Sequence, residues 1–267
     1  MRPIKFFCVT DKKVNFLTKK NHNLCWVGKE DSPENYLRCD IGDNIYHKEK
    51  YYSELTFHYW FWKNELKNMS DDMWIGFCQK RRFWIKDSSS KVNNIDDLKK
   101  NILRSIPTEW NDYDAFICEP IQVSPAKKIK LIKRGWKNWI KDPSILFNKD
   151  KHTIKLQFDM FHGYGNLDKA IDLMRSDQKD KFREYVNNNT KFNPNIMVIS
   201  KKPILIKWFN ELFDWLFKCE KIFGFENLTG YDTGRLYAYL SERYLSFWFN
   251  EFYKVKSCPW IFFDTSR

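Results

Sequence analysis

The 267-residue chain has little glycine or proline and lacks the short signatures of several enzyme classes. Gly and Pro number nine each, which excludes a low-complexity or disordered chain. The glycine patterns of dinucleotide-binding and P-loop proteins do not occur, nor do Gly-x-Ser-x-Gly and His-Glu-x-x-His. Dinucleotide oxidoreductases, P-loop nucleotidases, serine hydrolases and zinc proteases therefore lose their usual sequence support.

Long apolar runs and paired cysteines are also missing. No stretch approaches the roughly 20 apolar residues that a membrane span needs, and charges at Lys5, Asp11 and Lys12 leave no apolar core for a signal peptide. The seven cysteines stand singly, with no Cys-x-x-Cys pair, as is typical of buried thiols in a reducing compartment. We therefore expect a cytoplasmic protein, with any membrane contact peripheral.

Positive charge and aromatic side chains are abundant. Lys and Arg total 46 against 34 Asp and Glu, giving a net charge of +12, and aromatic residues make up 18% of the chain. Because Lys, Asn, Ile and Phe are all frequent, a base-composition bias in the genome can account for part of the charge. Such a bias does not explain the 12 Trp residues, whose rings suit a large core and also stack on sugars and bases.

Short apolar runs alternate with helical periodicities along the chain, whose length allows one large domain or two small ones. The runs predict strands at 4–10, 24–28, 73–78, 115–118 and 195–200. Spacings of three and four predict helices at 51–67, 95–105, 167–174, 205–219 and 236–247, while 86–94, 124–153 and 175–194 are polar. The alternation predicts an α/β fold with a mostly parallel central sheet flanked by helices and a helical C-terminal part.

Polar residues directly after the predicted strands are functional candidates, because ligands of such sheets bind beyond the carboxyl ends of the strands. They are Thr10 and Asp11, the cluster at 79–82, and Glu119. The 79–82 cluster contains Lys80, Arg81 and Arg82, and fixed cations can stabilise a diphosphate. The alternative is a solvated basic turn, or an Arg paired with the Asp pair at 71–72.

Residues 43–84 carry an ordered set of motifs. They are Asp-Asn-Ile at 43–45, Glu-Leu-Thr at 54–56, Tyr-Trp-x-Trp-Lys-Asn at 59–64, Ile-Gly at 75–76 and Arg-Arg-Phe at 81–83. In this order they resemble a bacterial and viral family of capsular-polysaccharide and lipopolysaccharide synthesis proteins. That family is known largely as a domain of unknown function, and it includes galactofuranosyltransferases. Weaker similarity at 195–200, 208–217 and 235–245 extends the resemblance over most of the chain.

The sequence departs from the family pattern at two places. The His-Tyr that precedes the Arg pair in the family is Gln79-Lys80 here, and the His-Lys after the first strand is Asp11-Lys12. A role of either His in acid/base chemistry or donor binding therefore does not carry over.

The resemblance implies a GT-A-like fold and a glycosyltransferase. Its donor would be a nucleotide-diphosphate sugar, with galactofuranose and hexoses as candidates, and its acceptor a surface polysaccharide, another glycan or a lipid-linked glycan. Residues 1–267 would form one glycosyltransferase-like domain, in which 1–120 bind the nucleotide sugar and 121–267, with the C-terminal helices, bind the acceptor. Such an enzyme must stabilise the departing diphosphate and, in an inverting reaction, deprotonate the acceptor hydroxyl.

Site residues are assigned on this basis. The predicted donor-binding residues are Thr10, Asp11, Asp43, Asn44, Arg81 and Arg82. The predicted catalytic carboxylates are Asp159, Glu54 and Glu242. His162 and Asn195 are predicted to bind the acceptor. Asp159 and His162 lie in LQFDMFHGYG, whose composition is typical of a substrate-facing loop.

Structural alternatives stay open for several of these residues. Glu54 also suits the first turn of a helix, and Asn195 needs no function at the start of a strand. Glu242 could instead pair with Arg235 or Arg243.

Asp112-Tyr113-Asp114 is an Asp-x-Asp triplet of the kind that many GT-A enzymes use to hold a metal. Here the apolar run 115–118 follows the triplet instead of preceding it, so a turn or strand-start role is preferred. We assign no metal ligands, and a requirement for Mn²⁺ or Mg²⁺ stays open.

Two other functions remain as alternatives. Basic and aromatic residues suit a non-catalytic nucleic-acid-binding protein. The aromatics fall largely at buried helical spacings, however, and no nucleic-acid-binding motif occurs, so we expect no nucleic-acid partner. The second alternative is a glycosyltransferase fold that only binds sugar, which the Gln79-Lys80 departure keeps open.

Overall fold

The structure, a computed structural model, describes residues 2–17, 22–89, 91–123 and 128–264. The chain folds into two compact units, each described by itself below. Unit 1 comprises Met1–Glu119, Asn195–Glu211 and Phe249–Arg267, and unit 2 comprises Pro120–Pro194 and Leu212–Trp248.

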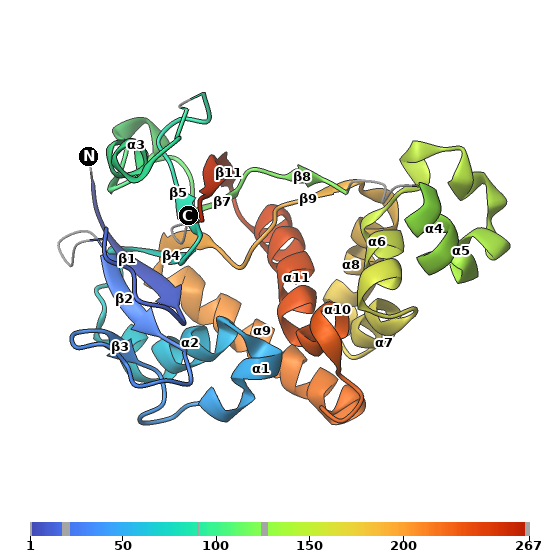
Figure 1. The fold of residues 1–267 in the computed structure, drawn as a ribbon, viewed down its shortest axis with the longest axis horizontal. Coiled ribbons are helices and arrows are strands. Elements are labelled where there is room, and N and C mark those ends of the chain that lie inside the picture. Colours follow the sequence, from blue (N-terminus) through green and yellow to red (C-terminus); the bar gives the residue numbers. More distant parts are fainter. Residues whose placement is uncertain (1, 18–21, 90, 124–127, 265–267) are drawn as a thin grey trace. The chain divides into compact units, whose positions relative to one another are not determined.

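Unit 1 is built on a mixed sheet whose strands run in the order β11-β7-β10-β4-β1-β2-β3. The strands are β1 (Arg2–Thr10), β2 (His22–Trp26), β3 (Leu37–Arg38), β4 (Trp74–Gln79), β7 (Ala115–Cys118), β10 (Val198–Lys201) and β11 (Val255–Cys258). Neighbours pair in parallel except at β10, which is antiparallel to both β4 and β7. The predicted mostly parallel sheet is therefore confirmed, and Figure 1 shows β1, β2 and β4 side by side.

Shorter strands extend this sheet. β5 (Arg82–Trp84) pairs antiparallel with β4 and with β12 (Trp260–Phe262), and β6 (Ser105–Ile106) pairs antiparallel with β1. β12 brings the C-terminal segment next to the residues that follow β4. Neither β11 nor β12 is among the strands predicted from the sequence.

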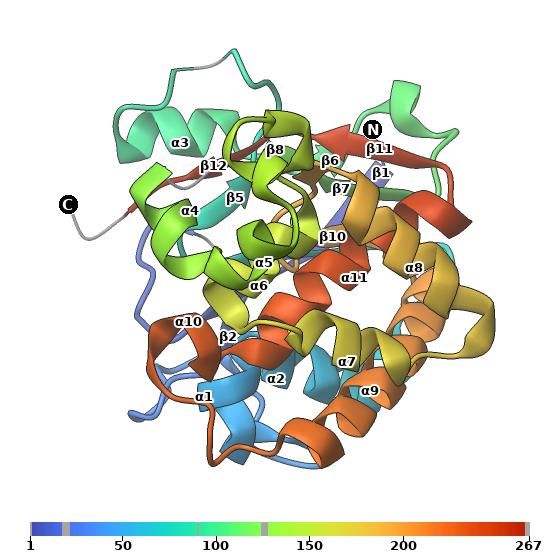
Figure 2. The same ribbon diagram turned by 90° about the vertical axis from the view of Figure 1, so that its right-hand side faces the viewer.

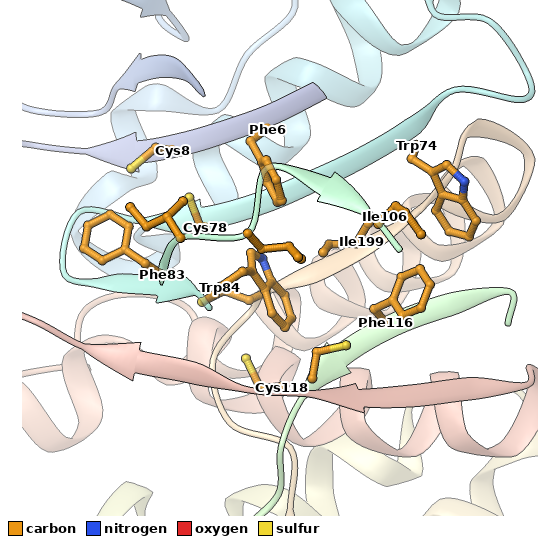
Figure 3. Close-up of a cluster of buried hydrophobic side chains, with 14 of the residues drawn as sticks. Phe6, Cys8, Trp74, Cys78, Phe83, Trp84, Ile106, Phe116, Cys118 and Ile199 are labelled. Carbon is orange, nitrogen blue, oxygen red and sulfur yellow. The ribbon is translucent and has the colours of Figure 1, made fainter. Parts of the chain in front are cut away.

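Side chains of β1 alternate between two buried layers, as strand geometry requires. On one face, Phe6 and Cys8 join a cluster with side chains of β4, β5, β7 and β10 (Figure 3). This face also includes Leu98 of α3 (Ile95–Asn101). Gly76 in β4 makes room for the ring of Phe6, because a Cβ at Gly76 would lie 2.6 Å from that ring.

The opposite face of the sheet packs against aromatic helices. The ring centroid of Phe7 lies 4.6 Å from that of Phe61 and 6.0 Å from that of Phe57. Phe209 of α9 (Lys202–Phe223) packs on Phe77 of β4 at 6.0 Å. Much of the aromatic excess of the chain is therefore core.

The aromatic segment is not the single helix over 51–67 that its spacing predicts. It consists of α1 (Glu49–Tyr52), α2 (Leu55–Trp60), a π-helical stretch (Phe61–Glu65) and a 3₁₀ turn (Leu66–Asn68). The break lies at Ser53, whose φ of 54° and ψ of −131° cannot continue a helix. That conformation is costly for a residue with a side chain.

Other segments also differ from what the sequence alone indicates. The helix predicted over 95–105 ends at Asn101, and its first turn is capped by the Asn94 side chain, which accepts a hydrogen bond from the Asp97 amide at 2.9 Å. The polar stretch 175–194 contains a long helix, α8 (Ser176–Asn188), which buries a narrow stripe that includes Phe182 and Val186. LQFDMFHGYG is largely helix, because α6 spans Ile154–His162.

Unit 2 is mainly helical (Figure 2). Its elements include α4 (Lys128–Arg134), α5 (Trp136–Lys141), α6, α7 (Asn166–Asp172), α8 and α10 (Gly230–Gly234), and β8 (Ile121–Gln122) pairs with β9 (Lys191–Phe192). The later part of α9 and most of α11 (Leu236–Phe252) also belong to it. Across the described residues, no helix is long and apolar enough to cross a membrane.

Candidate functional site

The site in unit 1 lies where several parallel strands of the sheet end, and we call this end of the sheet its carboxyl edge. β1, β2, β4 and β7 point their carboxyl ends to this edge, and β10, which runs the other way, begins there. Residues that follow these strands therefore meet at one edge, as the fold class leads us to expect. They include Asp11 after β1, Lys80 after β4 and Glu119 after β7.

Thr10 is the last residue of β1 at this edge, and Asp11 follows it. The Thr10 side chain is buried and its Oγ1 accepts a hydrogen bond from the Lys12 amide at 3.0 Å. The Asp11 carboxylate forms an ion pair with the ammonium of Lys80. Burial acts to raise the pKa of Asp11, but the hydrogen bond and charge of Lys80 outweigh it, so the pKa lies below its ordinary value.

A second polar group links Glu54, Gln79 and Arg82. The Gln79 amide nitrogen donates to Glu54 Oε1, and Gln79 Oε1 accepts from Arg82 Nη1 at 2.9 Å. A carboxylate only accepts and a guanidinium only donates, so these partners fix the orientation of the Gln79 amide. Among the described residues, none donates a hydrogen bond to the other carboxylate oxygen, Glu54 Oε2. Glu54 therefore has one oriented oxygen and one oxygen available to a ligand.

Glu54 follows directly after the strained Ser53. Its backbone oxygen accepts hydrogen bonds from Phe57 and His58 at 3.1 and 3.3 Å, so Glu54 starts the first turn of α2. Backbone strain of this kind gathers at functional sites when the surrounding structure holds it in place. Sequence reasoning missed this signal, because a serine gives no warning of a positive φ.

Arg81 lies in the turn between β4 and β5 and Arg82 is the first residue of β5, and both lie beside the C-terminal segment. Both guanidinium groups lie over the ring of Phe262, at 5.5 and 5.7 Å. Arg81 is 3.8 Å from the carboxylate of Asp264, whereas Asp71 pairs with Lys202 at 3.2 Å. The partner of Arg81 is therefore Asp264, which was not predicted from the sequence, and not the Asp pair at 71–72.

Asn195 is the residue at which the chain approaches β10. It is buried and has a positive φ of 67°, which Asn tolerates better than most residues. Its amide nitrogen lies 3.9 Å from the sulfur of Cys118, at the carboxyl end of β7. Asn195 and Glu119 therefore occupy the same edge of the sheet as Asp11 and Lys80.

Asp43 is held by the aromatic helical segment, whereas Asn44 bonds to its neighbours in the preceding loop and turn. Asp43 Oδ1 accepts from the Tyr59 hydroxyl at 3.0 Å, and its carbonyl accepts from Asn64 at 2.8 Å. Burial, followed by the hydrogen bond and charge of Asp43, raises the pKa of Tyr59 to about 12. Asn44 Oδ1 accepts from the Tyr46 amide at 3.1 Å. The motifs at 43–45 and 59–64 thus bind one another, which gives them a structural role whether or not they contact a donor.

Unit 2 holds Asp159 and His162 in buried positions on α6. Asp159 Oδ2 pairs with Lys155 at 2.9 Å, and Oδ1 accepts from the Gly165 amide at 2.9 Å. His162 Nδ1 lies 2.7 Å from the carbonyl of Asp232, so this nitrogen carries the proton. Burial, followed by the charge of Arg243, lowers the pKa of His162 to about 3. These contacts are those of a folded core, and the loop expected here is absent.

Glu242 and Arg243 form a second polar group of unit 2. Arg243 is buried and donates to Glu242 at 2.8 Å and to Gln157 at 2.8 Å, and it lies 3.4 Å from His162 Nε2. The pairing of Glu242 with Arg243, left open by the sequence, is therefore present. Arg235 instead lies over the ring of Tyr231 at 5.8 Å.

The Asp-x-Asp triplet lies at the amino end of β7. Asp114 Oδ2 accepts from the Lys254 amide at 3.0 Å, and the carbonyl of Asp114 accepts from the Ser200 hydroxyl at 2.8 Å. The triplet thus starts a strand at the edge of the sheet opposite to Asp11 and Lys80. Within the described ranges, no group of three or more His, Cys, Asp or Glu side chains is placed to hold a metal ion.

The architecture is similar to that of a solved structure, the WbbM bifunctional glycosyltransferase in its apo form. The match has a TM-score of 0.71 at 18% identity and covers 99% of this chain. The chain spans only 46% of the length of WbbM. The fold is thus an α/β fold with a mostly parallel central sheet and flanking helices, resembling part of WbbM, and the predicted fold class is confirmed.

The family follows from the sequence. Residues 5–254 match the model of DUF4422, a domain of unknown function. The chain therefore belongs to the DUF4422 family. A search of the curated proteins finds no significant match.

Proposed function

We propose that the protein is a glycosyltransferase that moves a sugar from a nucleotide-diphosphate donor to a glycan acceptor. The observation that carries the proposal is the convergence of Asp11, Glu54, Gln79, Lys80 and Arg82 at the carboxyl edge of the sheet. The similarity of the fold to part of a glycosyltransferase, WbbM, supports it.

Cations at this edge suit the diphosphate of the donor. Lys80 and Arg82 belong to the polar groups at the edge, and Arg81 lies between them in the chain. Guanidinium groups bind phosphate oxygens through charge-assisted hydrogen bonds, which are stronger than neutral ones. Positive charge fixed in this way stabilises the departing nucleoside diphosphate as the bond to the sugar breaks. A divalent cation that binds together with the donor would also stabilise the negative charge of the diphosphate.

Glu54 suits contact with the reacting sugars. Gln79 orients one carboxylate oxygen, which leaves Oε2 to accept a proton or a hydrogen bond from a sugar hydroxyl. Asn195, on the same edge, suits a second contact with a sugar hydroxyl. The roles predicted for Asp159, Glu242 and His162 in unit 2 stay predictions, as do a galactofuranosyl donor, a capsule or lipopolysaccharide acceptor, and the cytoplasmic location.

A thermal-shift screen tests the proposal, because a ligand that binds only the folded state raises the melting temperature. The probes are UDP-, GDP- and CDP-linked sugars, each with and without Mn²⁺. Release of nucleoside diphosphate in the presence of an oligosaccharide acceptor is then measured for the wild type and for Glu54→Gln. Loss of release with retained donor binding in the variant supports the assignment, whereas no shift with any nucleotide sugar contradicts it.

A sugar-binding protein without transferase activity is the second candidate. Gln79 favours it, because the polysaccharide-synthesis family that the sequence resembles has His at this position. Unlike His, Gln79 cannot take up a proton at neutral pH. Donor binding without release of nucleoside diphosphate by the wild type would favour it. Release restored by Gln79→His would show that this residue is the cause.

A further inference from the structure

Helices α4 and α5 of unit 2 expose large apolar side chains. Ile129, Ile132, Trp136 and Ile140 each have between 48% and 65% of their surface accessible. On α4, Leu131 instead packs into a buried cluster with Leu156 and Met160 of α6. The spacing of three between Ile129 and Ile132 on α4, and of four between Trp136 and Ile140 on α5, gathers the exposed residues of each helix on one side. Apolar residues gathered in this way mark interaction sites on protein surfaces.

The same segment is strongly cationic. Residues 129–141 contain no Asp or Glu, and their exposed cations are Lys130, Lys133, Arg134, Lys137 and Lys141. Arg134 is paired with Asp232 at 2.7 Å. The Nζ atoms of Lys137 and Lys141 lie 5.2 and 5.4 Å from the ring of Tyr164, beside α5. We call the exposed residues of 129–141 the α4–α5 face (Figure 2).

We propose that the α4–α5 face binds the surface of a membrane that contains anionic lipids. Isoleucine and tryptophan side chains enter the boundary between headgroups and acyl chains, while lysines keep their charge at the lipid phosphates. A nucleic acid offers phosphates but no apolar layer for the three isoleucines, which cannot stack on bases as aromatic rings do. The interleaving of isoleucine with lysine therefore favours a lipid surface.

The charge of the face is tested by sedimentation with phosphatidylcholine vesicles, with and without phosphatidylglycerol, at about 0.15 M salt. The wild type is expected to bind only the anionic vesicles. Lys133→Glu/Lys137→Glu should weaken this binding roughly 100-fold or more, since each cation near an anionic surface contributes roughly fivefold and reversal adds repulsion. Lys100→Glu/Lys207→Glu changes the net charge equally at exposed lysines of unit 1 and should bind like the wild type.

The apolar side chains are tested separately. Ile129→Ser/Ile140→Ser keeps the charge and should weaken binding roughly tenfold or more, because apolar side chains no longer enter the lipid. Ile206→Ser/Ile222→Ser, at exposed isoleucines of α9, is the matched control. Circular dichroism and the melting temperature check that each variant is folded.

Three outcomes would overturn the proposal. They are no wild-type binding to anionic vesicles, binding unaffected by both changes in the face, and tighter binding of a single-stranded oligonucleotide through the same residues. The experiment uses no donor or acceptor, so its result is independent of the proposed transferase activity.

Discussion

Replacing Arg82 with alanine should weaken donor binding far more than it weakens the fold. The guanidinium makes one hydrogen bond to Gln79, at 2.9 Å, and lies over the ring of Phe262. Loss of this partly buried hydrogen bond costs about 1 kcal/mol of unfolding free energy, which lowers the melting temperature by roughly 2–4 °C in a protein of this size. A charge-assisted bond to a phosphate contributes about 1.5–3 kcal/mol, so the donor dissociation constant should rise roughly 10- to 150-fold.

Isothermal titration with UDP, GDP and CDP, with and without Mn²⁺, measures the effect on the diphosphate alone. Arg81→Ala removes the same charge from the neighbouring position, where Asp264 lies 3.8 Å away in a partly exposed pair that should contribute about 1 kcal/mol or less to stability. Arg175→Ala, at an exposed Arg of unit 2 paired with Asp177, controls for net charge. Unchanged affinity in both Arg81→Ala and Arg82→Ala would refute the assignment of the diphosphate to this turn.

Three further predictions concern the fold. Burial lowers the pKa of His58 to about 3, so between about pH 6.5 and pH 3 only the unfolded state gains a proton at this residue, and the free energy of unfolding falls by about 1.4 kcal/mol per pH unit. His58→Phe removes this contribution, so its unfolding free energy in urea titrations should fall less between pH 7 and pH 5 than that of the wild type. An equal fall in the two proteins would contradict this. Asp159→Asn should cost about 1–3 kcal/mol in urea unfolding, because the buried bond to Lys155 loses its charge, and a cost below about 0.5 kcal/mol would argue against the pair. Gly42→Ala should lower the melting temperature, because φ is +66° and its Cβ would lie 2.5 Å from Asn64 Oδ1; a melting temperature equal to the wild type's would show that the loop can shift.

Local patterns predicted the elements of unit 1 well. The apolar runs at 4–10, 73–78 and 115–118 are the strands β1, β4 and β7, because each run is buried on both faces. The order of the strands could not be predicted, since nothing in the run at 195–200 shows that it inserts between β4 and β7. β11 was missed because Lys256 and Ser257 interrupt its apolar pattern, and β12 was missed because its apolar strand is only three residues long.

The candidate site was only partly predictable. Because ligands of α/β sheets bind beyond the carboxyl ends of the strands, the sequence indicated Thr10, Asp11 and the 79–82 cluster. These residues do lie at one edge of the sheet. The contacts that give Glu54, Gln79 and Arg82 their orientation depend on a backbone break at Ser53 and on side chains distant in sequence. Periodicity describes one element at a time and carries no information about such contacts.

The central place of β10 has a consequence for biosynthesis. β4 and β7 are neighbours of β10, yet β10 leaves the ribosome about 80 residues after the end of β7. At synthesis rates of about 5–20 residues per second, β7 waits roughly 4–16 s with an unpaired edge, and β4, which ends about 40 residues earlier, waits roughly 6–24 s. Such edges pair readily with other chains, so the nascent protein should depend on chaperones, and its yield should fall when synthesis outpaces them.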